Sequence, residues 1–176
     1  MKDELCTNII DVIKEEQIKL GYRKEQIRLY YPLSSLNLIL EKELECEDMK
    51  KYLEEYFLER KEIFGEVNVS YKDERFCLHL SDTASEYVNN HTEKTGFLYD
   101  FIEKISAHDV KINELVDLFH KYSDDVYFEK MENSEFDYLI YFVDGKPDSY
   151  WYLLTEEGHH ITYHRYTKQD FISMGL

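Results

Sequence analysis

The seven histidines are the residues of this chain whose chemistry can be judged first from spacing. His159 and His160 are adjacent, and His160 and His164 stand four residues apart, a spacing that makes two imidazoles neighbouring metal ligands on a helix. Residues 160–166 instead alternate in the manner of a strand, where positions four apart lie roughly 13 Å from each other. We therefore expect no metal site at this pair, and no metal-binding residues elsewhere in the chain. The remaining histidines are interpreted as surface or helix-end residues: His79, His91, His108 and His120.

The acidic residues also lack an arrangement that indicates catalysis. Glu43, Glu45, Glu47 and Asp48 crowd the start of a predicted helix, where negative charge favours the N-terminal dipole. The pair at positions 124–125 lies between a predicted helix and a predicted strand and is typical of a turn. No two of the carboxylates are spaced in a way that indicates a general acid and a general base. We therefore predict no catalytic residue.

Glycine and cysteine usage excludes several cofactor classes. The six glycines are isolated, so no glycine-rich loop brings backbone amides to a phosphate. There is no G-x-S-x-G or H-E-x-x-H motif, although triads assembled in space leave no such trace. The three cysteines (Cys6, Cys46 and Cys77) are far apart, which argues against a disulfide framework and a structural zinc site. We expect no cofactor.

The C-terminal part of the chain predicts an antiparallel meander. Four apolar and aromatic runs are separated by turn sequences: residues 126–131, 136–143, 150–155 and 160–166. We expect the three connections to pair Met131 with Phe136, Val143 with Tyr150, and Thr155 with His160. Because side chains alternate along a strand, these pairings give the sheet two faces, both rich in aromatic residues.

These pairings assign each side chain to a face. The expected core face holds Val126, Phe128, Leu139, Tyr141, Val143, Tyr150, Tyr152, Leu154, Ile161 and Tyr163. The expected second face holds Tyr127, Glu129, Met131, Phe136, Tyr138, Ile140, Phe142, Trp151, Leu153, Thr155, His160, Thr162 and His164. A shift of one residue at a turn would exchange these memberships.

The preceding residues predict helices and a hairpin. Residues 67–80 alternate cleanly around Asp73-Glu74, so Val67, Val69, Phe76 and Leu78 should be buried, and Asn68 and Ser70 should not. The other expected elements are a strand at 26–31 and helices at 3–20, 32–40, 47–63, 82–88, 97–105 and 112–122. The prediction is an α+β fold in which N-terminal and central helices pack on an antiparallel sheet that includes the hairpin (67–80) and the four-stranded meander (126–166).

Length and charge bound the function. A chain of 176 residues predicts one domain, residues 1–176, and 43% hydrophobic residues supply a core. The net charge of −16, shared by both halves, would repel nucleic acid and anionic lipid. No signal peptide and no apolar run long enough to span a membrane is found, so we expect a cytoplasmic protein that binds neither nucleic acid nor membrane.

Residues 21–36 (GYRKEQIRLYYPLSSL), together with the meander from 138 to 166, resemble a small uncharacterised bacterial family, a domain of unknown function that covers nearly the whole chain. The resemblance implies a single-domain bacterial cytoplasmic protein. It implies no activity and supplies no catalytic residues.

Two hypotheses for function remain. In the first, the chain is a non-enzymatic adaptor, inhibitor or immunity-type binder that uses the aromatic second face, with a protein partner or a second copy of itself in a homodimer. In the second, a pocket lined by Tyr, His and Glu side chains, Glu129 among them, binds a small molecule or acts as a hydrolase. The first hypothesis rests on Tyr138, Phe142 and Trp151, and the second on polar groups among Tyr127, Tyr138, His160 and His164. Taken together, the expected binding residues are Tyr127, Tyr138, Phe142, Trp151, His160 and His164.

Overall fold

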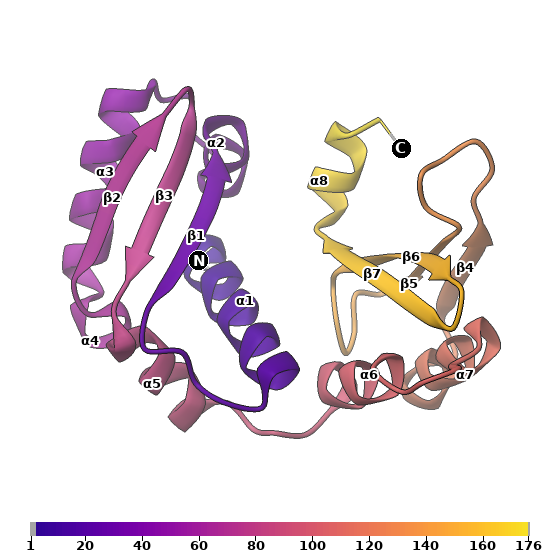
Figure 1. Ribbon diagram of the computed structural model, residues 1–176. Coiled ribbons are helices and arrows are strands. Elements are labelled where there is room, and N and C mark those ends of the chain that lie inside the picture. The colour runs from indigo at the N-terminus through magenta and orange to yellow at the C-terminus, as the bar shows by residue number, and fades with distance from the viewer. Residues whose placement is uncertain (1–2, 176) are drawn as a thin grey trace. The chain divides into compact units, whose positions relative to one another are not determined.

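The computed structural model describes residues 3–175, and the chain folds as two compact units, residues 1–93 and 94–176 (Figure 1). The first unit contains α1 (Glu4–Leu20), β1 (Ile27–Pro32), α2 (Leu33–Leu40), α3 (Cys46–Glu59), α4 (Lys61–Phe64), β2 (Val67–Lys72), β3 (Arg75–Leu80) and α5 (Asp82–His91). The second contains α6 (Phe97–Ile105), α7 (Ile112–Tyr122), β4 (Val126–Lys130), β5 (Tyr138–Phe142), β6 (Trp151–Glu157), β7 (His160–Tyr166) and α8 (Lys168–Ser173).

The first unit is built on an antiparallel sheet with strand order β1-β3-β2. The turn of the β2–β3 hairpin is Asp73-Glu74, as predicted, and both residues take the left-handed backbone conformation with φ of 49° and 60°. Asn68 and Ser70 are exposed, which confirms the predicted alternation. On the face toward the helices, Val69, Phe76 and Leu78 are buried as predicted and Leu80 is buried with them, whereas Val67 is partly exposed.

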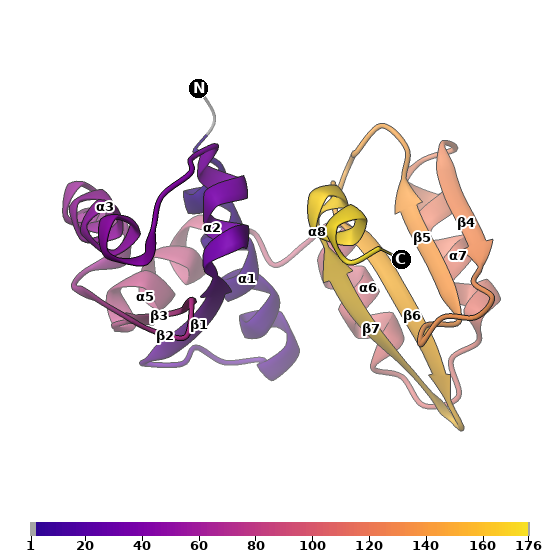
Figure 2. The same cartoon turned by 90° about the horizontal axis from the view of Figure 1, so that it is seen from above.

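Helices cover one face of this first sheet. Leu5, Ile9 and Ile13 of α1 join Leu53 and Phe57 of α3 in one apolar core against the sheet. Figure 2 shows these helices on one side of the sheet, with the other side left open. The helix predicted for residues 47–63 divides at Arg60 into α3 and α4.

The second unit is the predicted meander, with strand order β4-β5-β6-β7. Helices α6 and α7 lie on one face of the sheet and α8 on the other (Figures 1 and 2). Under α6 and α7, the rings of Phe101, Phe119 and Tyr152 form a buried aromatic core with edge-to-face geometry. Helix α8 is an element that was not predicted from the sequence.

The predicted register of the meander is wrong at all three connections. Met131 pairs with Asp137 rather than Phe136, because Met131 N donates to the Asp137 carbonyl at 2.8 Å. The β5–β6 pairing is also shifted by one residue, and the β6–β7 pairing by two, with Glu157 opposite His160. One single-residue shift on each side of β5 moves the side chains of that strand to the opposite face and leaves those of the other strands on their predicted faces.

The α+β class is confirmed, with the hairpin and the meander in two sheets rather than one. Each unit has buried apolar residues of its own. The expectation that residues 1–176 behave as one domain stays a prediction. Among residues 3–175, no helix is long and apolar enough to cross a membrane.

Candidate functional site

The changed register moves two of the expected binding residues into or beside the core. Phe142 is 2% exposed, and its ring centroid lies 4.8 Å from that of Phe97 and 4.9 Å from that of Phe119. Tyr138 lies on the same face of β5, stacks on Phe128 with a centroid distance of 5.7 Å and donates a hydrogen bond to Glu156 at 3.3 Å. The prediction that Phe142, Tyr138 and Ile140 share a face of the sheet with Trp151 is therefore wrong.

The second face of the sheet contains a small core and an open groove. Phe136, Leu139 and Leu153 are buried there against Phe171 of α8. Helix α8 covers only part of the face, and a groove of about 400 Å³ lies next to it. We call this the aromatic groove; it is lined by Tyr127, Glu129, Met131, Glu132, Leu139, Tyr141, Trp151 and Phe171.

Four aromatic rings run across the floor of the aromatic groove from β4 to α8. The Tyr127 ring stacks on Tyr141 at 4.9 Å, and Tyr141 stacks on Trp151 at 4.0 Å with an interplanar angle of 4°. Phe171 continues the row at 4.9 Å from Trp151. Alternate residues on neighbouring strands point to one face of a sheet, which is why rings from three strands and the following helix come together.

One end of this aromatic row is acidic. The Tyr127 hydroxyl donates to a carboxylate oxygen of Glu129 at 2.6 Å, and Glu132 lines the groove nearby. The hydrogen bond to Glu129, with some burial, raises the pKa of Tyr127. Burial and the charge of Glu129 also raise the pKa of Tyr141. Both phenols therefore stay protonated near neutral pH, and the negative charge of the site resides on its carboxylates.

A buried polar network supports the strand that carries Trp151. Asp148, in the loop before β6, accepts hydrogen bonds from the Tyr152 hydroxyl at 2.7 Å, the Tyr150 amide at 2.9 Å and Arg165 at 3.0 Å. The Arg165 and Asp148 side chains are only 5% and 9% exposed. These bonds tie the loop to β6 and β7 on either side of Trp151.

The two histidines predicted to bind lie outside the aromatic groove. His164 is exposed opposite Leu153 and lies near the rings of Phe136, at 5.5 Å, and Tyr166, at 6.0 Å. His160 lies at the tip of the β6–β7 hairpin, 5.2 Å from the ring of His108. Of the six expected residues, only Tyr127 and Trp151 line the groove. Leu139 and Tyr141 were assigned to the wrong face, and Phe171 lies in the helix that was not predicted.

The first unit contains two other cavities, and both are less suited to an apolar ligand. The larger, of about 630 Å³, is lined by mostly polar residues that include Lys50, Glu54 and His79, and His79 is paired with Gln26 at 3.2 Å. The smaller, of about 340 Å³, lies beside Asp3, Tyr56 and Arg60.

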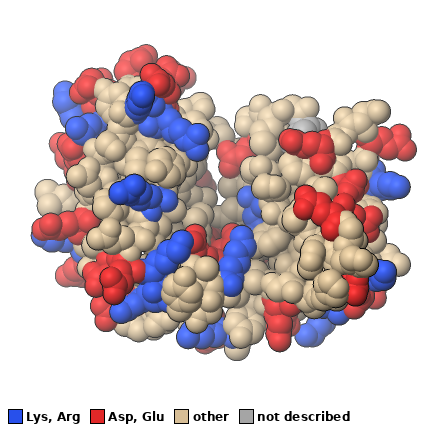
Figure 3. Space-filling model, in the orientation of Figure 1, with Lys and Arg blue, Asp and Glu red and all other residues tan. Residues whose placement is uncertain are grey.

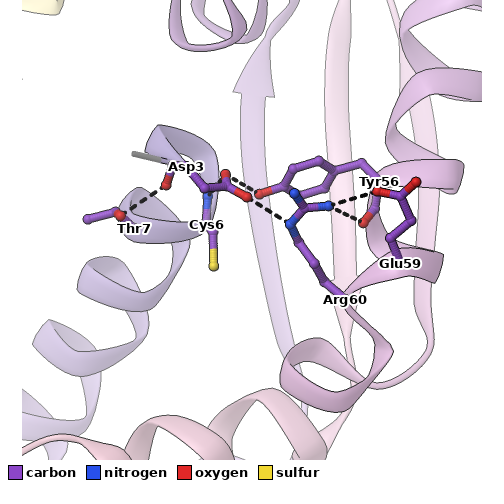
Figure 4. Close-up of polar contacts among 6 residues, drawn as sticks. All are labelled: Asp3, Cys6, Thr7, Tyr56, Glu59 and Arg60. Atoms are coloured by element: carbon purple, nitrogen blue, oxygen red, sulfur yellow. Dashed lines mark hydrogen bonds and ion pairs between the residues drawn. The ribbon is translucent and has the colours of Figure 1, made fainter. Parts of the chain in front are cut away.

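The polar cluster at the smaller cavity connects helix α1 to α3 (Figure 4). Asp3 accepts hydrogen bonds from the Tyr56 hydroxyl at 2.6 Å, from Arg60 Nε at 2.7 Å and from the amide of Cys6 at 3.0 Å. The Arg60 guanidinium also lies 3.8 Å above the Tyr56 ring. The bond from the Cys6 amide makes Asp3 the N-cap of α1, and the bonds from Tyr56 and Arg60 join this cap to α3.

The ionisation of this cluster also argues for a structural role. Burial opposes the charge on Asp3, but the hydrogen bonds from Tyr56, Cys6 and Arg60 outweigh it and lower the pKa of Asp3. Burial and then the hydrogen bond to Asp3 raise the pKa of Tyr56, and burial raises the pKa of the Cys6 thiol. At neutral pH the cluster holds an ionised Asp3, a protonated phenol and a protonated thiol. The phenol and the thiol are therefore poor nucleophiles, and the carboxylate, which accepts three hydrogen bonds and has a lowered pKa, is a weak base.

Comparison with known proteins finds one protein family, described as "Domain of unknown function, E. rectale Gene description (DUF3877)", whose model matches residues 2–174. No curated protein and no solved structure matches the chain.

Proposed function

The chain belongs to this bacterial family of domains of unknown function, and from that premise we propose that it is a non-enzymatic binding protein. Its aromatic groove would receive a basic segment of a partner protein, in the manner of an adaptor, an inhibitor or an immunity-type binder. The row of four aromatic rings that ends at the Glu129 carboxylate is the observation that carries this proposal.

The composition of the aromatic groove supports a basic, partly apolar occupant. The aliphatic chains of arginine and lysine pack against aromatic surface, and stacked rings offer a rigid apolar surface at low entropic cost. Glu129 and Glu132 add negative charge at the end of the row. Arginine satisfies both features, because its aliphatic chain packs on the aromatic row while its N–H groups bind a carboxylate.

The charge of the second unit favours such a partner over a second copy of the chain. Residues 94–176 carry 8 basic and 16 acidic side chains, a net charge of −8. Acidic side chains spread over both units among the basic ones (Figure 3). Two such grooves facing each other would bring like charges together, whereas a basic segment would be attracted and steered toward the site.

A binding role is favoured over the hydrolase hypothesis by the lining of the aromatic groove. Its eight described residues include no serine, cysteine, lysine or histidine. Its titratable groups are tyrosines and two glutamates, and the hydroxyl beside a carboxylate is that of Tyr127, whose pKa is raised by the hydrogen bond to Glu129, so it is a poor nucleophile at neutral pH. We also propose that the protein works in the cytoplasm and does not bind nucleic acid, in agreement with its free cysteines and its charge of −16.

The single tryptophan provides a direct test, because it lies in the aromatic groove. A random-peptide phage library is selected on the full-length protein and counter-selected on the Trp151→Ala variant. Synthetic copies of the enriched peptides are then titrated against the wild type while Trp151 fluorescence is recorded. We expect sequences that pair arginine or lysine with an apolar residue, and a saturable change in fluorescence.

Charge variants make the test specific. Glu129→Gln keeps an acceptor for Tyr127 but removes the charge, so it should weaken binding of the basic peptide and reduce its salt dependence. Glu103→Gln removes a charge from an exposed position on α6 and should leave binding unchanged. Isothermal titration calorimetry, which does not need the tryptophan, compares peptide binding to wild type and Trp151→Ala. Enrichment of acidic peptides, or equal binding to the two proteins, would refute the proposal.

A further inference from the structure

The two loops at one end of the second unit bring together residues that are far apart in the sequence. His108 and Asp109 lie between α6 and α7, and His159 lies in the turn between β6 and β7. One ligand atom from each of the three residues lies within 4.8 Å of the other two. We propose that His108, Asp109 and His159 form a binding site for a divalent transition-metal ion, with Zn²⁺ as the reference ion.

The backbone holds the two loops in register before any ion is bound. The Asp109 amide donates a hydrogen bond to the His159 carbonyl at 3.1 Å. Asp109, within the α6–α7 loop, adopts a left-handed conformation with φ of 60°. The ligand-bearing segments are therefore linked by a main-chain contact as well as by their side chains.

The side chains already converge on Asp109. One carboxylate oxygen lies 2.6 Å from His159 Nδ1, and the other lies 3.4 Å from His108 Nε2. Around a tetrahedral zinc ion, ligand atoms are about 3.3 Å apart, given Zn–N and Zn–O distances near 2.0 to 2.1 Å. Rotation of exposed side chains is enough to bring the three ligand atoms to that spacing.

The donor set suits zinc and its neighbours better than calcium or magnesium. Two imidazoles and one carboxylate are the ligands of many three-residue zinc sites, which leave a fourth position open. Water can fill that position, and so can His160, whose ring lies 5.2 Å from the His108 ring. All three proposed ligands are exposed, so the ion can enter from solvent and exchange with it.

The site differs from the one that spacing within the sequence would indicate. His160 and His164 lie on one strand and are too far apart to share an ion directly. The structure instead pairs His159 with residues about fifty positions earlier, on a separate loop. An ion bound there would link the α6–α7 loop to the β6–β7 hairpin.

Isothermal titration of the full-length, metal-stripped protein with zinc chloride tests the proposal. We expect one saturable site, lost on addition of EDTA, and a rise in melting temperature with zinc concentration. His108→Ala and His159→Ala should each weaken zinc binding by about tenfold or more. His120→Ala, which changes an exposed histidine on α7 outside the cluster, should bind as the wild type does.

Amide chemical shifts locate the ion independently of affinity. In ¹H–¹⁵N spectra, zinc should shift residues 106–111 and 157–161 and leave those of the first unit unchanged. The proposal is refuted if zinc does not bind saturably, or if binding is the same in His108→Ala, His159→Ala and the wild type. It is also refuted if the shifts fall elsewhere in the chain.

Discussion

The indole of Trp151 lies flat on the phenol ring of Tyr141, with ring centroids 4.0 Å apart and planes 4° from parallel. The two rings meet because β5 and β6 are antiparallel and align Leu139 with Leu153. Tyr141, two residues after Leu139, then lies opposite Trp151, two residues before Leu153, on the same face of the sheet. Both rings are partly exposed. This pair forms the centre of the aromatic groove, whereas Phe142, on the other face of β5, belongs to the core under α6 and α7.

Trp151 and Phe142 should therefore respond differently to truncation. Phe142→Ala removes a fully packed ring and should lower the free energy of unfolding by about 3 to 5 kcal/mol. Trp151→Ala removes a half-exposed ring and should cost less than half as much, while abolishing peptide binding. Urea denaturation followed by circular dichroism measures both. Equal losses in the two variants would show that Trp151 is an ordinary core residue.

The hairpin of the first unit allows a matched comparison on one strand pair. Leu78→Ala opens a cavity at a fully buried site and should cost about 2 to 5 kcal/mol in free energy of unfolding. Ser70→Ala changes an exposed side chain on the neighbouring strand and should fall within about 0.5 kcal/mol of the wild type. Unchanged melting of the Leu78 variant would contradict the observed register.

Asp3 should make the stability of the first unit depend on acid. Asparagine caps a helix as well as aspartate does, so Asp3→Asn removes mainly the charge facing Arg60, whereas Asp3→Ala also removes the cap and should cost about 0.5 to 2 kcal/mol. The pKa of Asp3 is lowered on folding from an ordinary value of 3.8. Its contribution is therefore complete above that value and is lost as pH falls through the folded pKa.

The measurement for Asp3 is a series of urea denaturations between neutral and strongly acidic pH. Wild type should exceed Asp3→Asn in free energy of unfolding at neutral pH, and the difference should shrink below pH 3.8. A difference that does not change with pH would mean that the charge of Asp3 has no part in stability.

Local periodicity was enough to predict most elements of this fold but not the face of β5. Helices α6 and α7 begin and end at the predicted residues, because their apolar residues recur at helical spacing. Strand register depends instead on loop geometry, and the connection after Met131, which contains Asn133 in a left-handed conformation, is one residue longer than predicted. A shift of two residues at the β6–β7 turn left the faces unchanged, whereas single shifts around β5 exchanged Tyr141 and Phe142.

The candidate sites were harder to predict than the fold. Tyr127 and Trp151 were identified because they alternate on strands that kept their predicted faces. Phe171 was missed because the six-residue helix α8 is too short to show a helical repeat. The cluster of His108 with His159 joins two loops through the fold, so no spacing in the sequence indicates it.

The buried ion pair between Asp148 and Arg165 should be sensitive to the loss of one partner. Asp148→Ala leaves Arg165 in a site where its side chain is only 5% exposed, and breaking such a pair costs about 3 to 5 kcal/mol. Ser149→Ala changes the exposed neighbour in the same loop and should be nearly neutral. Thermal denaturation compares the two, and a mild effect of Asp148→Ala would mean that water replaces the lost carboxylate.

The oligomeric state separates the proposed partner from a homodimer. Because each second unit carries a net charge of −8, we expect the protein to sediment as a monomer at low salt, and to form a complex when a basic peptide selected on the aromatic groove is added. Analytical ultracentrifugation over a range of protein concentrations makes the measurement, with Trp151→Ala as the matched variant. A wild-type dimer that dissociates in Trp151→Ala would assign the groove to self-association. A monomer that binds the peptide in wild type alone would support a basic partner, because the acidic end of the groove attracts opposite charge and repels another copy of itself.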